Sequence, residues 1–337
     1  MRGLISVLEE TSQLAHDTVD IIFKQKSLTK DISNYTKMSV EIVLNNDIAK
    51  DEGHVEVLGH KLFYRTFSSE NPKSTILCLH GGPGVPHDYI LSMTDLANFG
   101  YRVVFYDQLG VGKSDLPKNR RLFIVERYVE EVEGFRLAMN LGKIHLWGSS
   151  WGGFLAISYA LKYQQNLKSL ISAGGASSTP LTYKGMLKLR SELPATVQDT
   201  LKKYEDEGDY ESPAYLRALD VLYHKHVCRL AEWPAEVNYA FQNVSKPVYN
   251  TMWGPNEFTL IGNLMYWDVT SELNWIKTPT LVTCGRYDEV VPEVGEVLHD
   301  GIAGSKMIVF ENSSHLTFWE EREEYMKTMR EFLDQHN

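Results

Sequence analysis

The feature that most constrains the fold is a glycine-rich turn that joins an apolar run to an apolar helical pattern. The run covers residues 143–147, the turn covers Gly148 to Gly153, and a helix is predicted to continue through residues 154–161. Within the turn, only Ser150 has glycines both two positions before and two positions after it. A strand, a sharp turn and a helix in direct succession leave no room for side chains at those flanking positions. The pattern predicts a strained Ser150 whose hydroxyl projects from the edge of a sheet, although a turn without chemistry has the same composition.

Apolar strands alternate with helical patterns along most of the chain, which predicts a mostly parallel sheet with helices on both faces. The predicted strands are residues 54–58, 60–68, 74–80, 102–108, 143–149, 167–174, 279–285 and 306–311. The predicted helices between and after them are residues 87–99, 123–140, 151–163, 292–303 and 318–335. This gives an eight-stranded α/β fold that is interrupted once.

The interruption is helical in character and rich in tyrosine and tryptophan. Ligands bind at the carboxyl edge of open α/β sheets, so we interpret the insertion as a cap over that edge. A small helical subdomain with its own aromatic core is a compatible alternative. The predicted organisation is an N-terminal helical extension at 1–50, a first core part at 51–178, the cap at 179–274 and a second core part at 275–337.

The N-terminal extension shows apolar residues on one helical stripe that includes Leu4, Leu8, Ala15 and Val19. We expect a helix that packs on the main body. An oligomerisation or lid element is the open alternative, so a homo-oligomer formed through this helix is possible. No candidate catalytic residue falls in this stretch.

Composition excludes several classes of partner and site. The formal net charge of −10, from 34 basic and 44 acidic residues, argues against a nucleic-acid surface and suits cationic ligands. No apolar stretch approaches membrane-spanning length, and the run from Leu4 to Leu8 is too short for a secretory signal. Two of the three cysteines fall in predicted strands, as buried thiols in a reducing compartment do. We therefore expect a cytoplasmic protein with no membrane partner.

Three residues that follow predicted strands complete a nucleophilic site. A serine hydroxyl needs a base within hydrogen-bond reach and a group that orients the base. His315 directly follows the last predicted strand, and Asp288 follows the strand before it. The chain order Ser150, Asp288, His315 is that of α/β-hydrolases. The sequence predicts these three residues as the catalytic nucleophile, orienting acid and base.

The loop after the third predicted strand supplies the remaining part of such a site. His80 to Gly84 contains three glycines, which let the backbone approach a substrate carbonyl closely. We assign the oxyanion hole to the N–H groups of Gly82 and Trp151. Loss of one such donor costs about 3 kcal/mol of transition-state stabilisation. His80 is expected to brace the loop rather than to act as a base.

Four motifs resemble those of one enzyme family. They are His80 to Gly84, Tyr106 to Ser114, Gly148 to Gly153 and Gly285 to Asp288. Together they resemble the prolyl aminopeptidase (proline iminopeptidase) family of α/β-hydrolase serine peptidases, over about residues 50 to 335. The resemblance implies an α/β-hydrolase fold with an inserted helical cap domain.

Two further segments resemble one branch of that family. Residues 254–258 and the pair Asp288-Glu289 are similar to the branch that contains the tricorn-interacting aminopeptidase and the lactic-acid-bacterial iminopeptidases. In that branch, a cap glutamate and the glutamate after the triad aspartate hold the α-ammonium of the substrate. The resemblance implies this substrate-binding role for Glu257 and Glu289. Two close carboxylates repel each other, and a bound ammonium relieves that repulsion.

Metal and cofactor sites are not expected. His224 and His226 have no third ligand nearby, so a polar cap surface explains them better than a metal. Residues 107–112 contain spaced glycines but do not open a helix with a later ribose-binding acid, which argues against a dinucleotide.

The sequence favours a serine aminopeptidase that releases an N-terminal proline or other apolar residue from short peptides through an acyl-enzyme. Its expected partner is a small peptide or amino-acid amide with a free N-terminus. An amidase or esterase of the same fold, or an acyltransferase that uses the same acyl-enzyme, is the main alternative. A non-catalytic receptor that keeps the hydrolase pocket is a second alternative.

Overall fold

A computed structural model describes residues 42–337 of the chain. The predicted homo-oligomer contact and most of the predicted N-terminal extension lie outside these residues. The described end of that extension is not helical, because residues 42–48 contain a turn and strand β1 begins at Ala49.

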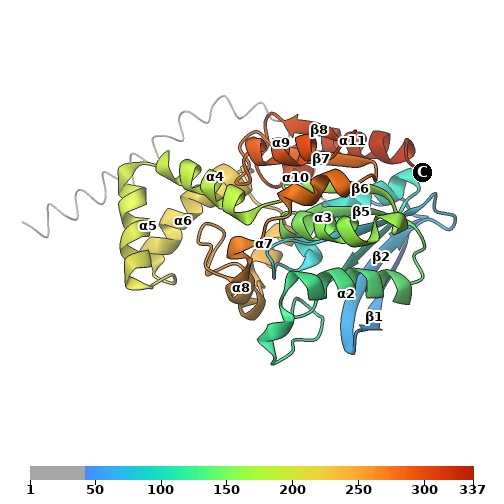
Figure 1. The fold of residues 1–337 in the computed structure, drawn as a ribbon, viewed down its shortest axis with the longest axis horizontal. Helices are drawn as coiled ribbons and strands as arrows, with labels where there is room; N and C mark the ends of the chain where they lie inside the picture. The colour runs from blue at the N-terminus through green and yellow to red at the C-terminus, as the bar shows by residue number, and fades with distance from the viewer. Residues whose placement is uncertain (1–41) are drawn as a thin grey trace, which may run out of the picture. The chain divides into compact units, whose positions relative to one another are not determined.

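The centre of the described part is an eight-stranded sheet in the order β1-β2-β4-β3-β5-β6-β7-β8 (Figure 1). Strand β2 pairs antiparallel with β1 and β4, and all other neighbours pair parallel. The strands are β1 Ala49–Val57, β2 His60–Ser68, β3 Thr75–Leu79, β4 Arg102–Tyr106, β5 Ile144–Ser149, β6 Leu167–Ala173, β7 Thr280–Gly285 and β8 Lys306–Phe310. The prediction of an eight-stranded, mostly parallel sheet is confirmed.

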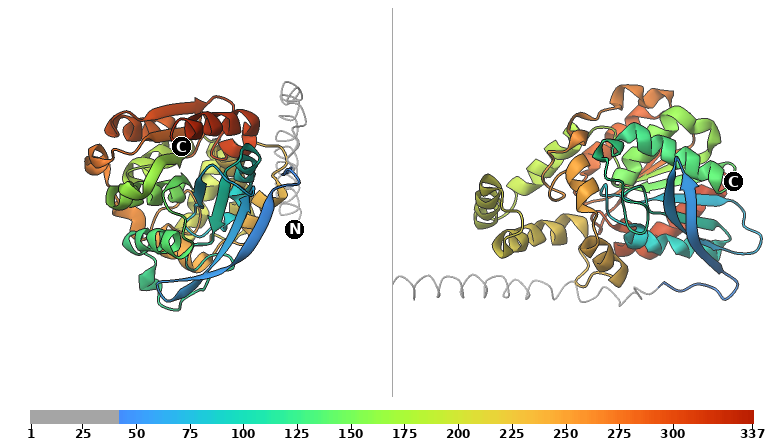
Figure 2. Two further views of the ribbon diagram at one scale, coloured as in Figure 1. Left: turned by 90° about the vertical axis from the view of Figure 1, so that its right-hand side faces the viewer. Right: turned by 90° about the horizontal axis from the view of Figure 1, so that it is seen from below.

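Helices lie on both faces of the sheet (Figure 2). Helix α3 packs on β5, β6 and α2, whereas η2 packs on β4 and α11. The elements outside the cap region are η2 His87–Phe99, η3 Arg120–Leu122, α2 Val125–Ala138, α3 Trp151–Tyr163, η4 Gln164–Asn166, α9 Pro292–Gly301, α10 Thr317–Glu320 and α11 Arg322–Asp334.

The core fills the space between these layers. Trp147 of β5 meets Phe318 edge-on at 5.4 Å between ring centroids, and its indole N–H donates to the Tyr325 hydroxyl at 2.8 Å. These rings are buried, so the polar tips of Trp147 and Tyr325 satisfy each other inside the apolar core.

The predicted helix at residues 87–99 is present with these bounds as a 3₁₀ helix, whereas one other predicted helix differs from the expectation. The predicted final helix is divided into α10 and α11, and the backbone leaves helical geometry at Glu321. The Glu321 carboxylate accepts hydrogen bonds from the N–H of Asn312 and the hydroxyl of Ser313, at 2.9 and 2.5 Å. This attachment to the preceding loop accounts for the break.

The insertion after β6 forms a group of helices beside the sheet (Figure 1). They are α4 Thr179–Ser191, α5 Ala195–Glu207, α6 Pro213–Leu222, η5 Tyr223–Val227, α7 Ala235–Gln242, α8 Lys246–Met252, η6 Asn263–Tyr266 and η7 Thr270–Trp275. We call residues 179–274 the cap, and the exact domain boundaries stay a prediction.

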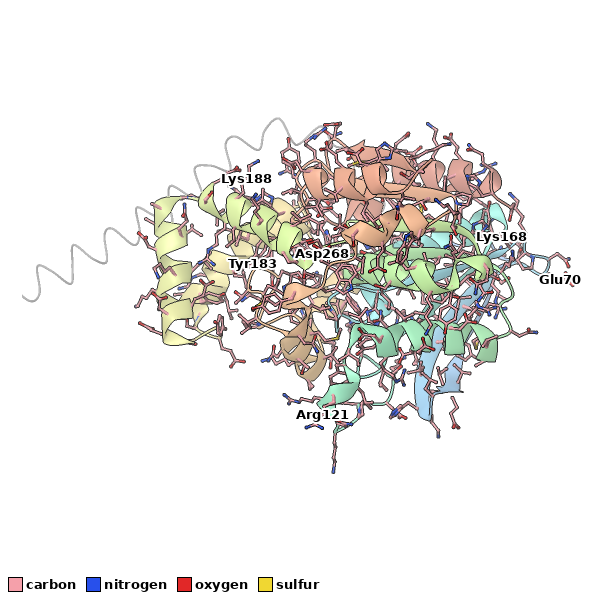
Figure 3. All side chains as sticks on the ribbon, in the orientation of Figure 1. Glu70, Arg121, Lys168, Tyr183, Lys188 and Asp268 are labelled. Atoms are coloured by element: carbon pink, nitrogen blue, oxygen red, sulfur yellow. The ribbon has the colours of Figure 1, made fainter. Side chains whose placement is uncertain are left out.

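The two ends of the cap leave the core side by side. Ser178 and Asp268 form an antiparallel bridge, and Figure 3 shows Asp268 near the centre of the molecule, where cap and sheet meet. The rings of Phe154 and Trp267 stack with centroids 5.3 Å apart, which ties the start of α3 to the end of the cap. No helix within residues 42–337 is long and apolar enough to cross a membrane.

Candidate active site

The turn between β5 and α3 holds Ser150 in a strained backbone conformation, with φ 56° and ψ −126°. Its N–H donates to the carbonyl oxygen of Ala173 at 2.9 Å, which fixes the turn to strand β6. A Cβ atom at Gly148 would collide with the backbone of Gly152, and one at Gly152 would collide with the carbonyl of Leu79. Both glycines are therefore required by close backbone contacts.

Ser150 lines a small cavity beneath the cap. Candidate residues from both core parts and from the cap meet there. The lining residues are Gly82, Val85, Tyr89, Ser150, Val227, Phe241, Glu257, Glu289, His315 and Leu316. The fold thus gathers side chains that are distant in sequence at the carboxyl edge of the sheet.

His315 and Asp288 form a buried pair beside Ser150. The imidazole Nδ1 donates to Asp288 Oδ1 at 2.6 Å, and the same carboxylate oxygen accepts the N–H of Val290 at 2.8 Å. These bonds fix the orientation of the ring and leave its Nε2 atom for the cavity. Nε2 makes no hydrogen bond within the described residues and lies 3.5 Å from Oε1 of Glu289.

The cavity concentrates negative charge around the imidazole. Burial disfavours the charged ring, but the carboxylates of Asp288 and Glu289 outweigh it and raise the pKa of His315 to about 10. Burial, and then the nearby Glu257 carboxylate, raise the pKa of Glu289 well above its usual range. Burial also raises the pKa of Glu257, against a hydrogen bond from the Tyr249 hydroxyl. The site therefore favours a bound cation.

The loop after β3 reaches the same cavity through Gly82, whose φ of 110° lies in the left-handed region that favours glycine. The preceding N–H, that of Gly81, donates to the Tyr89 hydroxyl at 2.7 Å. Trp151 is the first residue of α3 and directly follows Ser150, so its N–H lies at a helix N-terminus, where negative charge is favoured.

His80 holds the loop in place. Its Nε2 accepts the backbone N–H of Gln108 at 2.9 Å, and its carbonyl accepts the Gln108 amide, also at 2.9 Å. The Gln108 side chain in turn accepts the indole N–H of Trp151 at 2.9 Å. Burial lowers the pKa of His80 to about 4, so the ring stays neutral and serves as an acceptor.

Sequence reasoning did not single out Tyr89, Gln108 or Tyr249. Gln108 lies in the motif Tyr106 to Ser114, so the resemblance offered a signal for it. Tyr89 and Tyr249 carry no spacing signal, because their roles arise from contacts across the fold.

The histidines of the cap do not form a metal site. No cluster of three or more metal-ligating residues occurs in residues 42–337. His224 is exposed, as expected for a polar cap surface. His226 differs from that expectation, because it is partly buried and its Nδ1 donates to the carbonyl of Tyr287 at 2.8 Å.

Comparison with known proteins shows the family to which the chain belongs. Residues 74–322 match the family model for the alpha/beta hydrolase fold. The chain is 44% identical to the proline iminopeptidase of Thermoplasma volcanium, across 85% of this chain and 97% of that protein. It is also 44% identical to the proline iminopeptidase of Saccharolobus solfataricus, across 85% of this chain and 93% of the relative.

A solved structure gives the same result. The proline iminopeptidase of Mycobacterium smegmatis superposes with a TM-score of 0.80 at 31% identity, and the match covers 85% of this chain and 98% of that one. The sequence identities, the shared fold and the matched family model lead to one conclusion: the chain belongs to the proline iminopeptidase family of α/β-hydrolase serine enzymes.

Proposed function

We propose that this protein is a serine aminopeptidase that releases an N-terminal proline or other apolar residue from short peptides. The observation that carries the proposal is one small cavity that contains Ser150, His315 and the two buried carboxylates Glu257 and Glu289. A nucleophile and a base can carry out acyl transfer, and two carboxylates can bind the free N-terminal amine of a substrate.

In this proposal, Ser150 attacks the carbonyl carbon of the first residue while His315 Nε2 accepts the hydroxyl proton. Asp288 orients the imidazole and stabilises its charged form. The N–H groups of Gly82 and Trp151 stabilise the oxyanion. His315 then gives the proton to the departing amine, and a water molecule releases the first residue from the acyl-enzyme by the same route.

Glu257 and Glu289 bind the α-ammonium of the substrate. Without a cation, the carboxylates of Asp288 and Glu289 raise the pKa of His315, which favours the protonated ring over the form that acts as a base. An ammonium between the two glutamates cancels part of this negative charge and lowers the His315 pKa. Substrates with a free N-terminus thus favour the active protonation state of the base.

The remaining walls set the size and polarity of the first side chain. Val85, Val227, Phe241 and Leu316 are apolar and line the cavity. An acidic side chain would lose its hydration there and would face Glu257 and Glu289, at a cost of several kcal/mol. A small apolar first residue, of which proline is the compact example, fits this enclosure.

The test compares prolyl 4-nitroanilide with its N-acetylated form. We expect rapid release of nitroaniline from the free amine and release at least a hundredfold slower from the acetylated compound, because a buried charge pair is worth about 2–5 kcal/mol. Equal rates would overturn the amine-binding role of Glu257 and Glu289 and would favour an amidase or esterase of the same fold.

Two further measurements test for an acyltransferase and for a non-catalytic receptor. Added amine acceptors would divert the acyl group if the protein were an acyltransferase. A non-catalytic receptor would leave Ser150 unlabelled by a fluorophosphonate. A panel of aminoacyl anilides then ranks the first residues. A cytoplasmic location and self-association through the N-terminal segment stay predictions.

A further inference from the structure

One short segment of the cap contacts both loops that carry the candidate acid and base. It consists of His226 to Arg229, at the end of η5 and directly after it, and we call it the cap bridge. The carbonyl oxygen of His226 accepts the N–H of Glu289 at 3.1 Å and the N–H of His315 at 3.2 Å. One backbone atom thus joins the loop after β7 to the loop after β8.

Side chains of the cap bridge hold Tyr287, the residue before Asp288. The Nδ1 of His226 donates to the Tyr287 carbonyl at 2.8 Å. The guanidinium carbon of Arg229 lies 3.9 Å from the centroid of the Tyr287 ring, within the range of a cation–π contact. The N–H of Tyr287 donates to the carbonyl of Ser313 at 3.0 Å, so Tyr287 also contacts the loop that carries His315.

The far end of the cap bridge is attached to the loop that carries His315 through a partly buried glutamate, Glu320. The N–H groups of Arg229 and Ser314 both donate to the Glu320 carboxylate, at 2.7 and 2.8 Å. The carbonyl of Val227 accepts the N–H of Leu316 at 3.1 Å. Val227 and Leu316 both line the cavity, so the attachment reaches the substrate wall.

We propose that His226 and Arg229 are positioning residues: from the cap, they hold Tyr287 and thereby fix the loops of Asp288 and His315 relative to Ser150. The proposal rests on the proposed function of the triad, and it assigns the cap a part in catalysis beyond covering the substrate. A misplacement of reacting groups by about 1 Å can lower a rate about a hundredfold.

Substitution of His226 removes only the contacts of its side chain. Its backbone carbonyl remains in every variant and can still accept the N–H groups of Glu289 and His315. Burial lowers the pKa of His226, which keeps the ring neutral at pH 7, and the neutral ring donates to Tyr287 as the Nδ1–H tautomer.

The experiment uses the full chain and compares His226→Ala, His226→Asn and His224→Ala. His224 is the matched control, because it lies in the same η5 turn and contacts Asp220 rather than Tyr287. We expect His226→Ala to lower kcat for prolyl 4-nitroanilide about tenfold or more with KM little changed. The asparagine amide donates to a carbonyl, so His226→Asn should recover most of the loss, and His224→Ala should stay within about twofold of the parent protein.

Arg229→Ala provides the second, independent variant. A smaller loss of kcat, about two- to fivefold, is expected because a cation–π contact at an exposed site is weak. Thermal unfolding of each variant is recorded beside its kinetics. The proposal would be overturned if His226→Ala unfolds as the parent protein does and retains its kcat. It would also be overturned if His224→Ala lowers kcat as much as His226→Ala does, or if His226→Asn does not recover kcat.

Hydrolysis of a 4-nitrophenyl ester without an amine separates this proposal from the proposed function. Failure of the parent protein to cleave the anilide, together with cleavage of the ester, would count against the aminopeptidase and not against the cap bridge. The His226 series is then measured on the ester, where a kcat equal to that of the parent would overturn the positioning role.

Discussion

The turn that carries Ser150 and the loops that carry Asp288 and His315 are positioned in different ways. The turn is fixed by close backbone contacts of Gly148 with Gly152 and of Gly152 with the end of β3, and by the bond from Ser150 to β6. The two loops are fixed by hydrogen bonds to a cap segment about sixty to ninety residues earlier in the chain. The position of the proposed nucleophile therefore depends on the turn and the sheet strands beside it, whereas the positions of the proposed acid and base depend on how the cap packs.

The largest expected effect comes from removal of the nucleophile itself. Ser150→Ala should lower kcat by about a millionfold, as complete loss of a serine nucleophile does, while the turn keeps its shape because its glycines remain. Rates of prolyl 4-nitroanilide cleavage and fluorophosphonate labelling measure this. Substantial residual turnover at a purified Ser150→Ala protein would mean that another group attacks the substrate.

A methyl group at Gly152 tests the contact between the turn and the end of β3. Gly152→Ala would force Cβ against the carbonyls of Leu79 and His80, so we expect a loss of about 1–3 kcal/mol or more in the free energy of unfolding. Gly295→Ala is the control, since Gly295 also lies in a helix and has no positive φ, but its Cβ would approach only the flexible end of the Met307 side chain more closely than 3.4 Å. Denaturant unfolding of both variants measures the difference, and equal losses would contradict the packing explanation.

The electrostatic link between the glutamates and the base gives a prediction on substrate choice and pH. Glu289→Gln should lower kcat/KM for the free-amine anilide about a hundredfold, because it removes one partner of a buried charge pair. On an amine-free ester, the rate at neutral pH should not fall, because no ammonium is bound and a lower His315 pKa favours the base form. The Glu289 carboxylate raises the pKa of His315, so its removal should shift the acid limb of the ester profile to lower pH.

Glu293→Gln is the control for that prediction, because Glu293 is exposed on α9 and its Oε1 lies 3.7 Å from Lys188 Nζ. It should leave both the anilide kinetics and the ester profile unchanged. If the acid limb of the Glu289→Gln profile does not shift, the Glu289 carboxylate does not raise the pKa of His315.

The smallest expected effect concerns the pH dependence of stability at the cap bridge. Burial raises the pKa of Glu320 to about 7 from its usual 4.5, so the folded protein holds a proton there that the unfolded chain has lost. The folded state binds more protons between these values, and stability should fall as pH rises from about 4.5 to 7. Glu320→Gln cannot ionise, and its denaturant midpoint should vary less across that range than the midpoint of the parent protein.

The sequence predicted the parts of the site that local geometry or strand order determines. Ser150 was identified from two glycines, and His315 and Asp288 from their places after the last two strands. The eight-stranded, mostly parallel sheet was predicted from the alternation of strands and helices. These signals are strong because a sharp turn and a strand end each restrict the residues that fit.

The remaining parts depend on contacts that no local pattern records. Gln108 and Tyr89 support the loop of Gly82 through hydrogen bonds that join elements distant in the sequence, namely the loops after β3 and β4 and the helix η2. His226 has the pattern of a polar surface residue, yet its ring donates to Tyr287 across the junction between cap and core. The break at Glu321 has the same origin, since its cause is a bond to the preceding loop rather than a weak helical sequence.

The paired ends of the cap have an evolutionary consequence. Because Ser178 and Asp268 pair in one β-bridge, the chain enters the cap and leaves it at adjacent points of the core. A cap attached in this way can be exchanged between related enzymes without a change in the sheet or in the turn that carries Ser150. A cap taken from a related enzyme would give the cavity a different lining around the first side chain of the substrate. It would also need a segment that contacts Tyr287 as the cap bridge does, because kcat would otherwise fall.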